Sequence, residues 1–329
     1  MPPAKTLRPR GASEDWLILS ESMATPRWSE PPGLKTRFIV NPRSGRNRAG
    51  AFRALAFASR HGHAVSLTTH PRHAAELARQ ALDEGCELIV AVGGDGTLNE
   101  VAGALLDGPA TLGLVPCGSG NGLARHLGIY GPHRHVFRTL TEGRSCLIDT
   151  GLADGRPFFT TAGLGFEAEI SARFNKSGHR GFLRYLALSV RAFREWQPED
   201  CVITHDSSRE RVRAFTLTAA NASQYGNNAR IAPHARVDDG LLDLCVVPPI
   251  TPWNSLPLLG RLFTGTLAGA RRVTFRQSAR FTVERAKPGL IHTDGEVHQA
   301  GARVEFAIRP RSLRVLVPGD TETGTATPR

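Results

Sequence analysis

The 329-residue sequence lacks any apolar run approaching the ~18 residues that a membrane-spanning helix needs. Its opening segment also lacks the apolar core of a secretory signal peptide. Cysteine is sparse, with no Cys-x-x-Cys pair among the five residues Cys86, Cys117, Cys146, Cys201 and Cys245. An odd, scattered set of thiols predicts reduced cysteines in a cytoplasmic protein. The length leaves room for two domains with a substantial core.

Acidic residues are fewer than basic ones, and the net charge is +11. Acidic and basic residues cancel within residues 1–33, so the excess belongs to the folded body. Such a surface suits nucleic acid, an anionic membrane or a phosphorylated substrate. The aromatic interleaving typical of nucleic-acid binding is absent, and we expect no nucleic-acid partner.

Histidines are frequent, but their spacing closes no convincing tetrahedral metal site. The residues concerned are His61, His63, His70, His73, His133 and His135. We expect them to be solvated or to cap local structure.

The chain divides into four segments by composition. Residues 1–33 are rich in Pro, Ser and Glu and predict a disordered extension, and residues 318–329 predict a disordered tail. Residues 34–148 alternate short apolar runs with helical segments, which predicts a parallel sheet covered by helices. The predicted strands are 37–40, 64–68, 87–92 and 111–115, and the helices are 49–60, 71–84, 98–106 and one from 123 onward.

Residues 149–317 have mostly strand-like patterns, with a hairpin signal at Asp154-Gly155. This half predicts a mainly antiparallel β-sandwich with helical insertions. Its predicted strands are 148–153, 157–162, 201–205, 212–221, 241–247, 272–275, 281–284 and 304–308, and its helices are 181–196 and 252–264.

The most informative segment is an apolar run from Leu88 that ends in Gly93-Gly94-Asp95-Gly96-Thr97, followed at once by a helical pattern. Glycines at such a junction let a ligand approach the backbone. The free amides that open the next helix favour a phosphate. Asp95 then stands where it can meet a metal ion or a reacting hydroxyl, as in the nucleotide site of a kinase. The alternative is a plain strand–turn–helix junction.

Three further segments suit a phosphate-handling site. Two are strand-to-loop junctions, at Asn41-Pro42-Arg43-Ser44-Gly45 and Gly118-Ser119-Gly120-Asn121-Gly122. The third, Asp294-Gly295-Glu296, places two carboxylates on either side of a glycine. Each alone can be read as a turn.

Together the four segments resemble the diacylglycerol kinase catalytic-domain superfamily, which includes bacterial lipid kinases and the sphingosine and ceramide kinases. They occur in that superfamily's order and spacing, over roughly residues 35–316. A single Gly-Gly-Asp-Gly is shared with NAD kinases and phosphofructokinases, so the set of four is the specific signal.

The resemblance implies an α/β domain like that of NAD kinase, followed by a β-sandwich, with ATP and Mg²⁺ between them. It implies catalytic roles for Asp95, Asp294 and Glu296. The implied ATP contacts are Asn41, Pro42, Arg43, Ser44, Gly45, Thr69, Gly93, Gly94, Asp95, Gly96, Thr97, Gly118, Ser119 and Asn121. Bacterial relatives use the residue matching Glu296 as proton acceptor, whereas sphingosine kinases assign that role to the one matching Asp95. Our hypothesis is that Asp95 organises the metal through water and Glu296 takes the proton.

A structural Mg²⁺ site is implied by similarity in the segment that ends in Asp-Gly. Asp239 would give its carboxylate there, while Arg236 and Leu241 would give backbone carbonyls; a bare hairpin turn is the alternative. Glu167 and Glu169 lie where relatives carry an acidic residue near the lipid head group. Gly122 stands where bacterial diacylglycerol kinases often have aspartate, so the sequence leans toward a sphingoid-like or other amphiphilic alcohol.

The expected function is therefore transfer of the γ-phosphate of Mg-ATP to the hydroxyl of a lipid alcohol. Expected partners are a lipid substrate, transient contact with an anionic membrane surface and a second copy in a homodimer. The protein would then be cytoplasmic and peripherally membrane-associated. The alternatives are an NAD-kinase-like phosphotransferase and a non-catalytic basic binding protein.

Overall fold

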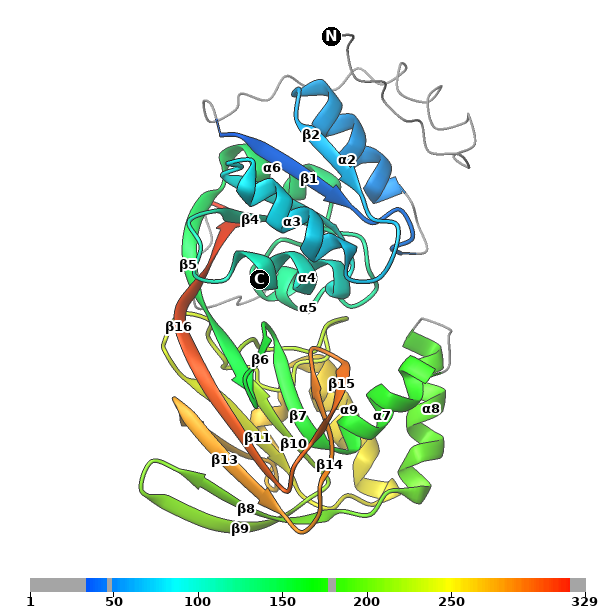
Figure 1. Cartoon of the computed structure of the whole chain (residues 1–329). Coiled ribbons are helices and arrows are strands. Elements are labelled where there is room, and N and C mark those ends of the chain that lie inside the picture. Colours follow the sequence, from blue (N-terminus) through cyan, green and yellow to red (C-terminus); the bar gives the residue numbers. More distant parts are fainter. Residues whose placement is uncertain (1–33, 46–48, 177–181, 320–329) are drawn as a thin grey trace.

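The computed structural model describes residues 34–45, 49–176 and 182–319, with the side chains of residues 182–187 excluded. The predicted N-terminal extension, and all but Pro318 and Gly319 of the predicted tail, fall outside this range. Figure 1 shows the described chain as two halves stacked end to end. The first half carries the N-terminal strands, and the second carries the antiparallel strands.

The N-terminal half is built on four parallel strands in the order β2-β1-β3-β4. Helices flank the sheet, so β3 is buried along its whole length, which explains its unbroken apolar sequence. The strands are β1 (Thr36–Val40), β2 (Ala64–Leu67), β3 (Leu88–Gly93) and β4 (Thr111–Pro116). The helices are α2 (Ala49–Arg60), α3 (His73–Asp83), α4 (Asp95–Leu105), α5 (Gly122–His126) and α6 (His133–Glu142).

The C-terminal half contains a six-stranded antiparallel sheet in the order β12-β11-β10-β7-β14-β15. Its strands are β7 (Thr161–Gly165), β10 (Thr216–Ala220), β11 (Leu242–Val247), β12 (Thr274–Ser278), β14 (Gly289–Thr293) and β15 (Glu296–Ala300). A second layer contains β6 (Arg156–Phe158), β8 (Glu199–His205), β9 (Ser208–Ala214) and β13 (Arg280–Arg285). Phe158, Phe281 and Phe306 fill the core between the layers with side chains of the six-stranded sheet.

Three helices are inserted in this half, namely α7 (Phe166–Lys176), α8 (Phe182–Glu195) and α9 (Pro252–Thr264). They share a third apolar cluster with the sheet, in which Phe193 of α8 and Leu258 of α9 pack with buried Phe215. Helical insertions therefore cover apolar surface that the two-layer sandwich leaves open.

Two long strands join the halves, β5 (Arg144–Ala153) and β16 (Arg303–Val317). β16 pairs with β4 in the first half and with β13 in the second, and it pairs with β5 almost throughout. The pairing shifts register between Arg309 and Leu313, where Arg311 has a φ of 49°. In Figure 1 the red β16 and green β5 run through both halves, so one ten-stranded sheet connects them.

The predicted fold class, a parallel α/β domain followed by an antiparallel sandwich, is confirmed. Some boundaries differ. α4 begins at Asp95 and not at residue 98, because the Gly94 carbonyl accepts the Leu98 N–H and starts the helix inside the glycine loop. α3 begins at His73, so Pro71 precedes the helix. β14 and β15 were not predicted as strands, since their polar residues break the apolar alternation.

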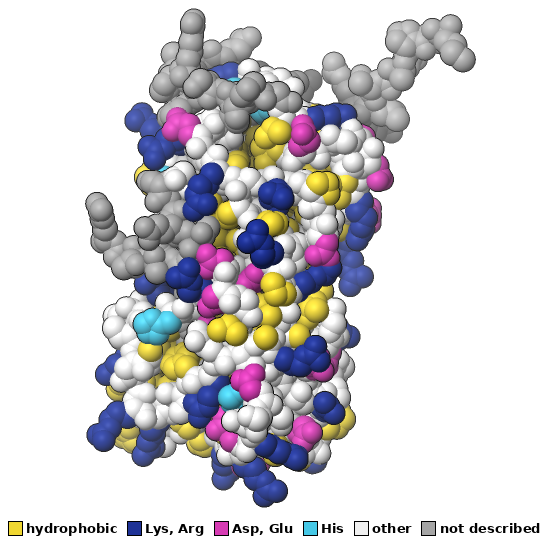
Figure 2. All heavy atoms as spheres, turned by 90° about the vertical axis from the view of Figure 1, so that its left-hand side faces the viewer, with side chains coloured by type: hydrophobic (Ala, Val, Ile, Leu, Met, Phe, Trp, Pro, Cys, Tyr) yellow, Lys and Arg dark blue, Asp and Glu magenta, His cyan; other side chains and the backbone are white. Residues whose placement is uncertain are grey.

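Figure 2 shows Lys and Arg side chains over both halves of one face, with fewer Asp and Glu among them. None of the helices in the described ranges is both long and apolar enough to cross a membrane.

Candidate active site

Asp95 connects two strand–loop–helix junctions. It is the first residue of α4, directly after the glycine pair that ends β3. Its carboxylate accepts the N–H of Asn121 and the N–H of Gly122, each at 2.8 Å. Gly122 begins α5, so Asp95 lies against the N-terminus of a second helix. The two loops that the sequence singled out are thus brought into direct contact.

The glycines in these loops are required by close backbone packing. A Cβ added to Gly118 would lie 2.7 Å from the Cα of Gly94, and one on Gly120 would lie 2.7 Å from Asp95 Oδ2. Asn121 has a left-handed φ of 54° and its side-chain amide bonds both the N–H and the carbonyl of Gly118. The Gly118–Gly122 loop is therefore held in shape before any ligand arrives.

The Asn41 loop meets the same edge of the sheet. Asn41 Oδ1 accepts the N–H of Arg43 at 3.0 Å, and Asn41 Nδ2 donates to Thr97 Oγ1 at 3.0 Å. Ser44 is buried against Gly94, where its Oγ would be 3.2 Å from an added Cβ. Loops after β1, β3 and β4 thus converge, with Ser119 exposed among them.

Thr69 lies in the loop between β2 and α3, next to the β1 edge. Its N–H donates to His73 Nδ1 at 3.0 Å. The Glu100 carboxylate accepts the N–H groups of Arg72 and Ala74, both at 3.0 Å, and so fixes the start of α3 onto α4. Thr69 is therefore held by side chains from a helix start that α4 itself positions.

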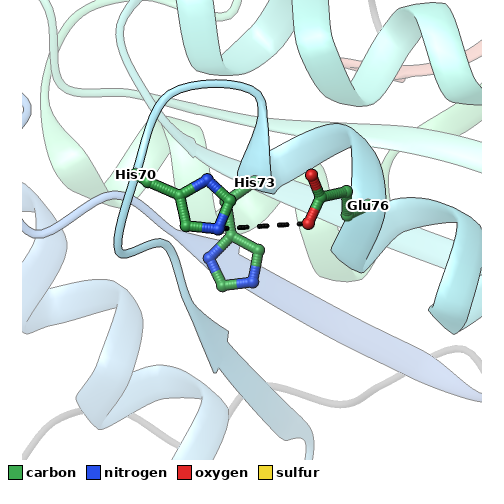
Figure 3. A group of neighbouring side chains, drawn as sticks. All are labelled: His70, His73 and Glu76. Atoms are coloured by element: carbon green, nitrogen blue, oxygen red, sulfur yellow. Dashed lines mark ion pairs between the residues drawn. The ribbon is translucent and has the colours of Figure 1, made fainter.

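Figure 3 shows His70, His73 and Glu76, whose ligand atoms lie within 4.8 Å of one another. The His70 and His73 rings stack with centroids 4.3 Å apart, and His70 Nε2 is 4.0 Å from Glu76. His73 Nδ1 accepts the Thr69 N–H at 3.0 Å, so this ring nitrogen already has a partner within the loop. His73 thus caps the loop that carries Thr69.

Asp294 anchors the β14–β15 hairpin. It occupies the turn with a φ of 50°, followed by Gly295 at 83°. Its carboxylate accepts three backbone N–H groups, from Phe159 at 2.7 Å, Thr160 at 2.8 Å and Thr161 at 3.0 Å, and the Thr160 hydroxyl as well. This turn is consequently fixed to the segment between β6 and β7.

Asp95 and Asp294 come from different halves of the molecule, and the charge of Asp294 acts on Asp95. Burial raises the pKa of Asp95, and the negative charge of Asp294 acts in the same direction. The N–H groups of Asn121 and Gly122 oppose that rise in the pKa. Two carboxylates that lie near the boundary between the two halves are a donor set that fits a hard divalent cation. Such a cation would relieve the repulsion between the two negative charges.

Glu296 is the first residue of β15 and its side chain is exposed. Only Gly295 separates it from Asp294, and Asn175 Nδ2 of α7 donates to the Gly295 carbonyl at 3.0 Å. The turn therefore has a fixed, half-buried carboxylate and an exposed one side by side, which suits one for positioning and the other for proton transfer.

Glu167 and Glu169 occupy different environments although both lie in the first turn of α7. Glu167 is buried and accepts hydrogen bonds from the Thr218 hydroxyl at 2.9 Å and from the Tyr225 hydroxyl. Glu169 is half-buried and pairs at 2.7 Å with Arg173, which reaches Glu195 of α8 at 2.7 Å. The structure thus separates the two carboxylates into a buried network and a surface ion-pair network.

Sequence reasoning missed His292, which links the buried network to the Asp294 turn. Its Nε2 lies 3.3 Å from Glu167 Oε1, and its Nδ1 accepts the N–H of Gly295 at 3.3 Å. The sequence does contain one sign of this buried network, the glycine at position 163. A Cβ at Gly163 would come within 1.7 Å of Glu167 Oε1. A glycine inside a strand can mark such a close approach.

The segment expected to hold a structural Mg²⁺ lies before β11. Asp239 Oδ1 accepts the Leu241 N–H at 3.0 Å, while Arg236 pairs its side chain with Asp238 at 3.2 Å. Burial, followed by the charges of Asp149 and Asp238, raises the pKa of Asp239. Both Asp149 carboxylate oxygens accept backbone N–H groups, from Gly240 and Arg311 at 2.7 Å each, so Asp239 is the carboxylate of this turn that is left to offer an oxygen to a hard cation.

Two family profiles together match nearly all of the described chain. That of the "Diacylglycerol kinase catalytic domain" matches residues 35–153. That of the "YegS C-terminal NAD kinase beta sandwich-like domain" matches residues 160–317. The chain is 31% identical to a probable lipid kinase YegS-like of Pseudomonas aeruginosa, over 81% of this chain and 88% of that protein.

The chain belongs to the diacylglycerol kinase family. It is 27% identical to a diacylglycerol kinase of Bacillus subtilis, over 86% of this chain and 96% of the relative. The family's enzymes are phosphotransferases with an alcohol group as acceptor, and this chain is a kinase of that class.

Solved structures agree at the level of the fold. A putative diacylglycerol kinase from Bacillus anthracis has a TM-score of 0.71 at 19% identity, covering 88% of this chain and 98% of that one. An NAD kinase from Archaeoglobus fulgidus in complex with ATP has a TM-score of 0.50 at 13% identity, covering 85% of this chain and 93% of that one.

Proposed function

We propose that this lipid kinase transfers the γ-phosphate of Mg-ATP to the hydroxyl of a diacylglycerol-like or sphingoid-like lipid alcohol. The observation that carries the proposal is the contact of Asp95 with the Gly118–Gly122 loop on one side and its electrostatic coupling to Asp294 on the other. Phosphoryl transfer depends on positioning and on charge compensation around the phosphates. The boundary between the two halves provides the positioning through its loops and the charge compensation through its carboxylates.

ATP would bind along the edge where the loops after β1, β3 and β4 converge. Backbone amides at the start of α4 are suited to phosphate oxygens, whereas Asp95 occupies the first amides of α5. The residues we assign to ATP are Asn41, Pro42, Arg43, Ser44, Gly45, Thr69, Gly93, Gly94, Asp95, Gly96, Thr97, Gly118, Ser119 and Asn121. The preformed loop around Asn121 supports this assignment, because little ordering would be needed on binding.

Asp95 and Asp294 would hold the Mg²⁺, in part through water. When bound, the metal supplies charge compensation between the β- and γ-phosphates. Glu296 takes the proton of the acceptor hydroxyl as its oxygen bonds the γ-phosphorus. The bond from that phosphorus to the bridging oxygen breaks, and ADP leaves. An exposed carboxylate beside a fixed one is suited to this proton transfer.

For the lipid head group, Glu169 is the better of the two acidic candidates, since it is the more exposed. Glu167 would act indirectly, through His292 and the Gly295 N–H, by orienting the turn that carries Glu296. A structural Mg²⁺ would be held by Asp239 with the carbonyls of Arg236 and Leu241. The enzyme would work in the cytoplasm, associated peripherally with an anionic membrane, as a monomer or a homodimer.

Transfer of labelled γ-phosphate to a lipid panel in mixed micelles tests the proposal. The panel holds diacylglycerol, monoacylglycerol, sphingosine, ceramide and undecaprenol. Glu296→Gln should abolish most turnover, and Glu142→Gln, which changes an exposed carboxylate on α6, serves as the matched control. Undiminished turnover in Glu296→Gln would refute its role as proton acceptor.

The fold is also similar to that of an NAD kinase, so phosphorylation of NAD⁺ is the second candidate function. NAD⁺ therefore belongs in the same assay. If the labelled phosphate appears on NAD⁺ and on no lipid, NAD⁺ replaces the lipid alcohol as the proposed acceptor.

A further inference from the structure

The segment between Asp243 and Glu284 is basic and free of acidic residues. It contains Arg261, Arg271, Arg272, Arg276 and Arg280 without a single Asp or Glu. Arg276 pairs with Glu210 at 3.1 Å, and Arg280 pairs with Glu305 at 3.3 Å. Within the described ranges, no ion pair is recorded for the other three arginines. These three lie on or next to α9.

α9 exposes an unusual amount of apolar surface. Trp253 is 91% exposed, Leu256 is 72% exposed and Leu259 is 36% exposed. Their spacing of three residues places them along one face of the helix. No side chain of α9 is fully buried, and the helix holds to the sheet through the partly buried Leu258 and Leu262. A soluble surface rarely leaves such residues adjacent without a partner.

A groove of about 440 Å³ runs beside this helix and extends the apolar surface. Prolines and aliphatic side chains line much of it, including Pro249, Ile250 and Leu258. Arg261, Arg271 and Arg272 complete the lining. Apolar surface is thus edged by cations whose charge is not balanced by nearby carboxylates.

We propose that α9 and this groove form a docking surface for an anionic phospholipid bilayer. The inference rests on the proposed function, because a lipid acceptor must be reached in a membrane. Trp253, Leu256 and Leu259 would enter the interfacial region, where Trp in particular is favoured. Arg271 and Arg272 would meet the phosphate head groups, which is the charge complementarity that selects a bilayer over a neutral partner.

A hydrogen-bonded loop connects this surface to the candidate active site. Asn228 Nδ2 donates to the Phe263 carbonyl at 3.0 Å, and the Arg230 N–H donates to the Leu262 carbonyl at 2.8 Å. In the same loop the Asn227 N–H donates to the Gly120 carbonyl at 2.9 Å. The loop of residues 227–230 thus contacts both the C-terminal end of α9 and the loop assigned to the phosphates, so a docked bilayer would lie near the point of transfer.

Sedimentation of the full-length protein with vesicles tests the surface. One set contains phosphatidylcholine with phosphatidylglycerol, and the other contains phosphatidylcholine alone. The double variant Trp253→Ser with Leu256→Ser should reduce partitioning to anionic vesicles roughly tenfold or more, because it removes the apolar area. Arg271→Gln with Arg272→Gln should reduce it about fivefold for each charge and weaken its salt dependence. Val65→Ser, an exposed apolar position on β2, is the control and should change nothing.

The outcomes separate docking from catalysis. Unchanged vesicle binding by the Trp253 and Leu256 variant, or no binding by the wild-type chain, overturns the docking surface. Light scattering that shows wild-type dimers and variant monomers also overturns it, because α9 would then join two copies. Lipid phosphorylation in neutral detergent micelles reports on the proposed function separately, and the variant should retain it. Vesicle binding without any lipid phosphorylation would sustain the surface and refute the kinase assignment to lipids.

Discussion

The two halves of the molecule contribute different chemical groups to the candidate site. The N-terminal half offers the backbone amides of the glycine loop that begins α4, while Asp95 of that loop caps α5. The C-terminal half offers side chains, namely Asp294, Glu296 and the buried Glu167 with His292. Parallel strands that lead into helices leave the first amides of each helix unpaired. Antiparallel hairpins pair most of their amides, so polar chemistry there must come from side chains.

The two aspartates illustrate the same difference. Asp95 accepts two amides that begin a helix, and burial raises its pKa. Asp294 accepts three amides and a hydroxyl from the β6–β7 segment, and so holds two strand pairs together. We therefore expect Asp95 to matter mainly for turnover and Asp294 to matter for stability as well.

The largest expected effect separates these roles. Asp95→Asn should lower kcat about a thousandfold or more, because positioning of the charged phosphates depends on it. Its melting temperature should fall only modestly, because the variant loses one of two backbone N–H contacts but also removes a charge that burial and Asp294 disfavour. Asp294→Asn should instead lower both kcat and the melting temperature. Calorimetry beside the kinase assay measures this, and equal loss of stability in both variants would contradict the distinction.

Gly163→Ala should destabilise the C-terminal half by about 3 kcal/mol. The new methyl would meet Glu167 Oε1 at 1.7 Å and the Leu217 carbonyl at 2.5 Å, so neither group could relax freely. Gly103→Ala on α4 of the other half is the control, because a Cβ there meets nothing within 4 Å. That change should be neutral or slightly stabilising in urea titrations. A tolerated alanine at 163 would show that the buried network adapts.

His126 gives a pH dependence at the contact between the halves. It is buried on α5, its Nδ1 accepts the Ser223 N–H at 3.1 Å, and burial lowers its pKa to about 4. A lowered pKa means that stability from the neutral ring is complete above about pH 6.5 and is lost as the pH falls toward 4. The loss should reach roughly 3 kcal/mol over this window.

His126→Asn keeps an acceptor for the Ser223 N–H but removes the titration. Guanidine titrations between pH 7 and pH 4 should therefore show a shallower decline for the variant than for the wild type. Parallel declines would mean that His126 does not govern the contact.

The smallest expected effect concerns Mg²⁺ without nucleotide. Binding at Asp239 should raise the free energy of unfolding by about 1 kcal/mol, or the melting temperature by about 2 °C, at millimolar Mg²⁺. Asp239→Asn should abolish the shift, whereas Asp83→Asn, an exposed carboxylate on α3, should leave it intact. A shift that survives Asp239→Asn would move the cation to another site.

Much of the site could be predicted from sequence, because its N-terminal part depends on local backbone rules. A buried strand that ends in glycines and a polar residue is typical of a phosphate-binding loop. Asp95 and Asn121 were predicted from that pattern. Glu167 was picked out by similarity, but its burial beside Tyr225 and His292 was not predicted. Those partners are 58 and 125 residues away along the chain, and no local pattern links them.

The sequence by itself determined the order of the two folds, the glycine loops and the carboxylates available to the site. Each of these follows from neighbours a few residues apart, through strand alternation, helix starts and the freedom of glycine. Only the tertiary structure decided that β16 joins the halves, that Asp294 lies near enough to Asp95 for its charge to act there, and that Trp253 of α9 is exposed. These depend on which surfaces meet after long segments of chain intervene, and that choice is set by packing of the whole molecule.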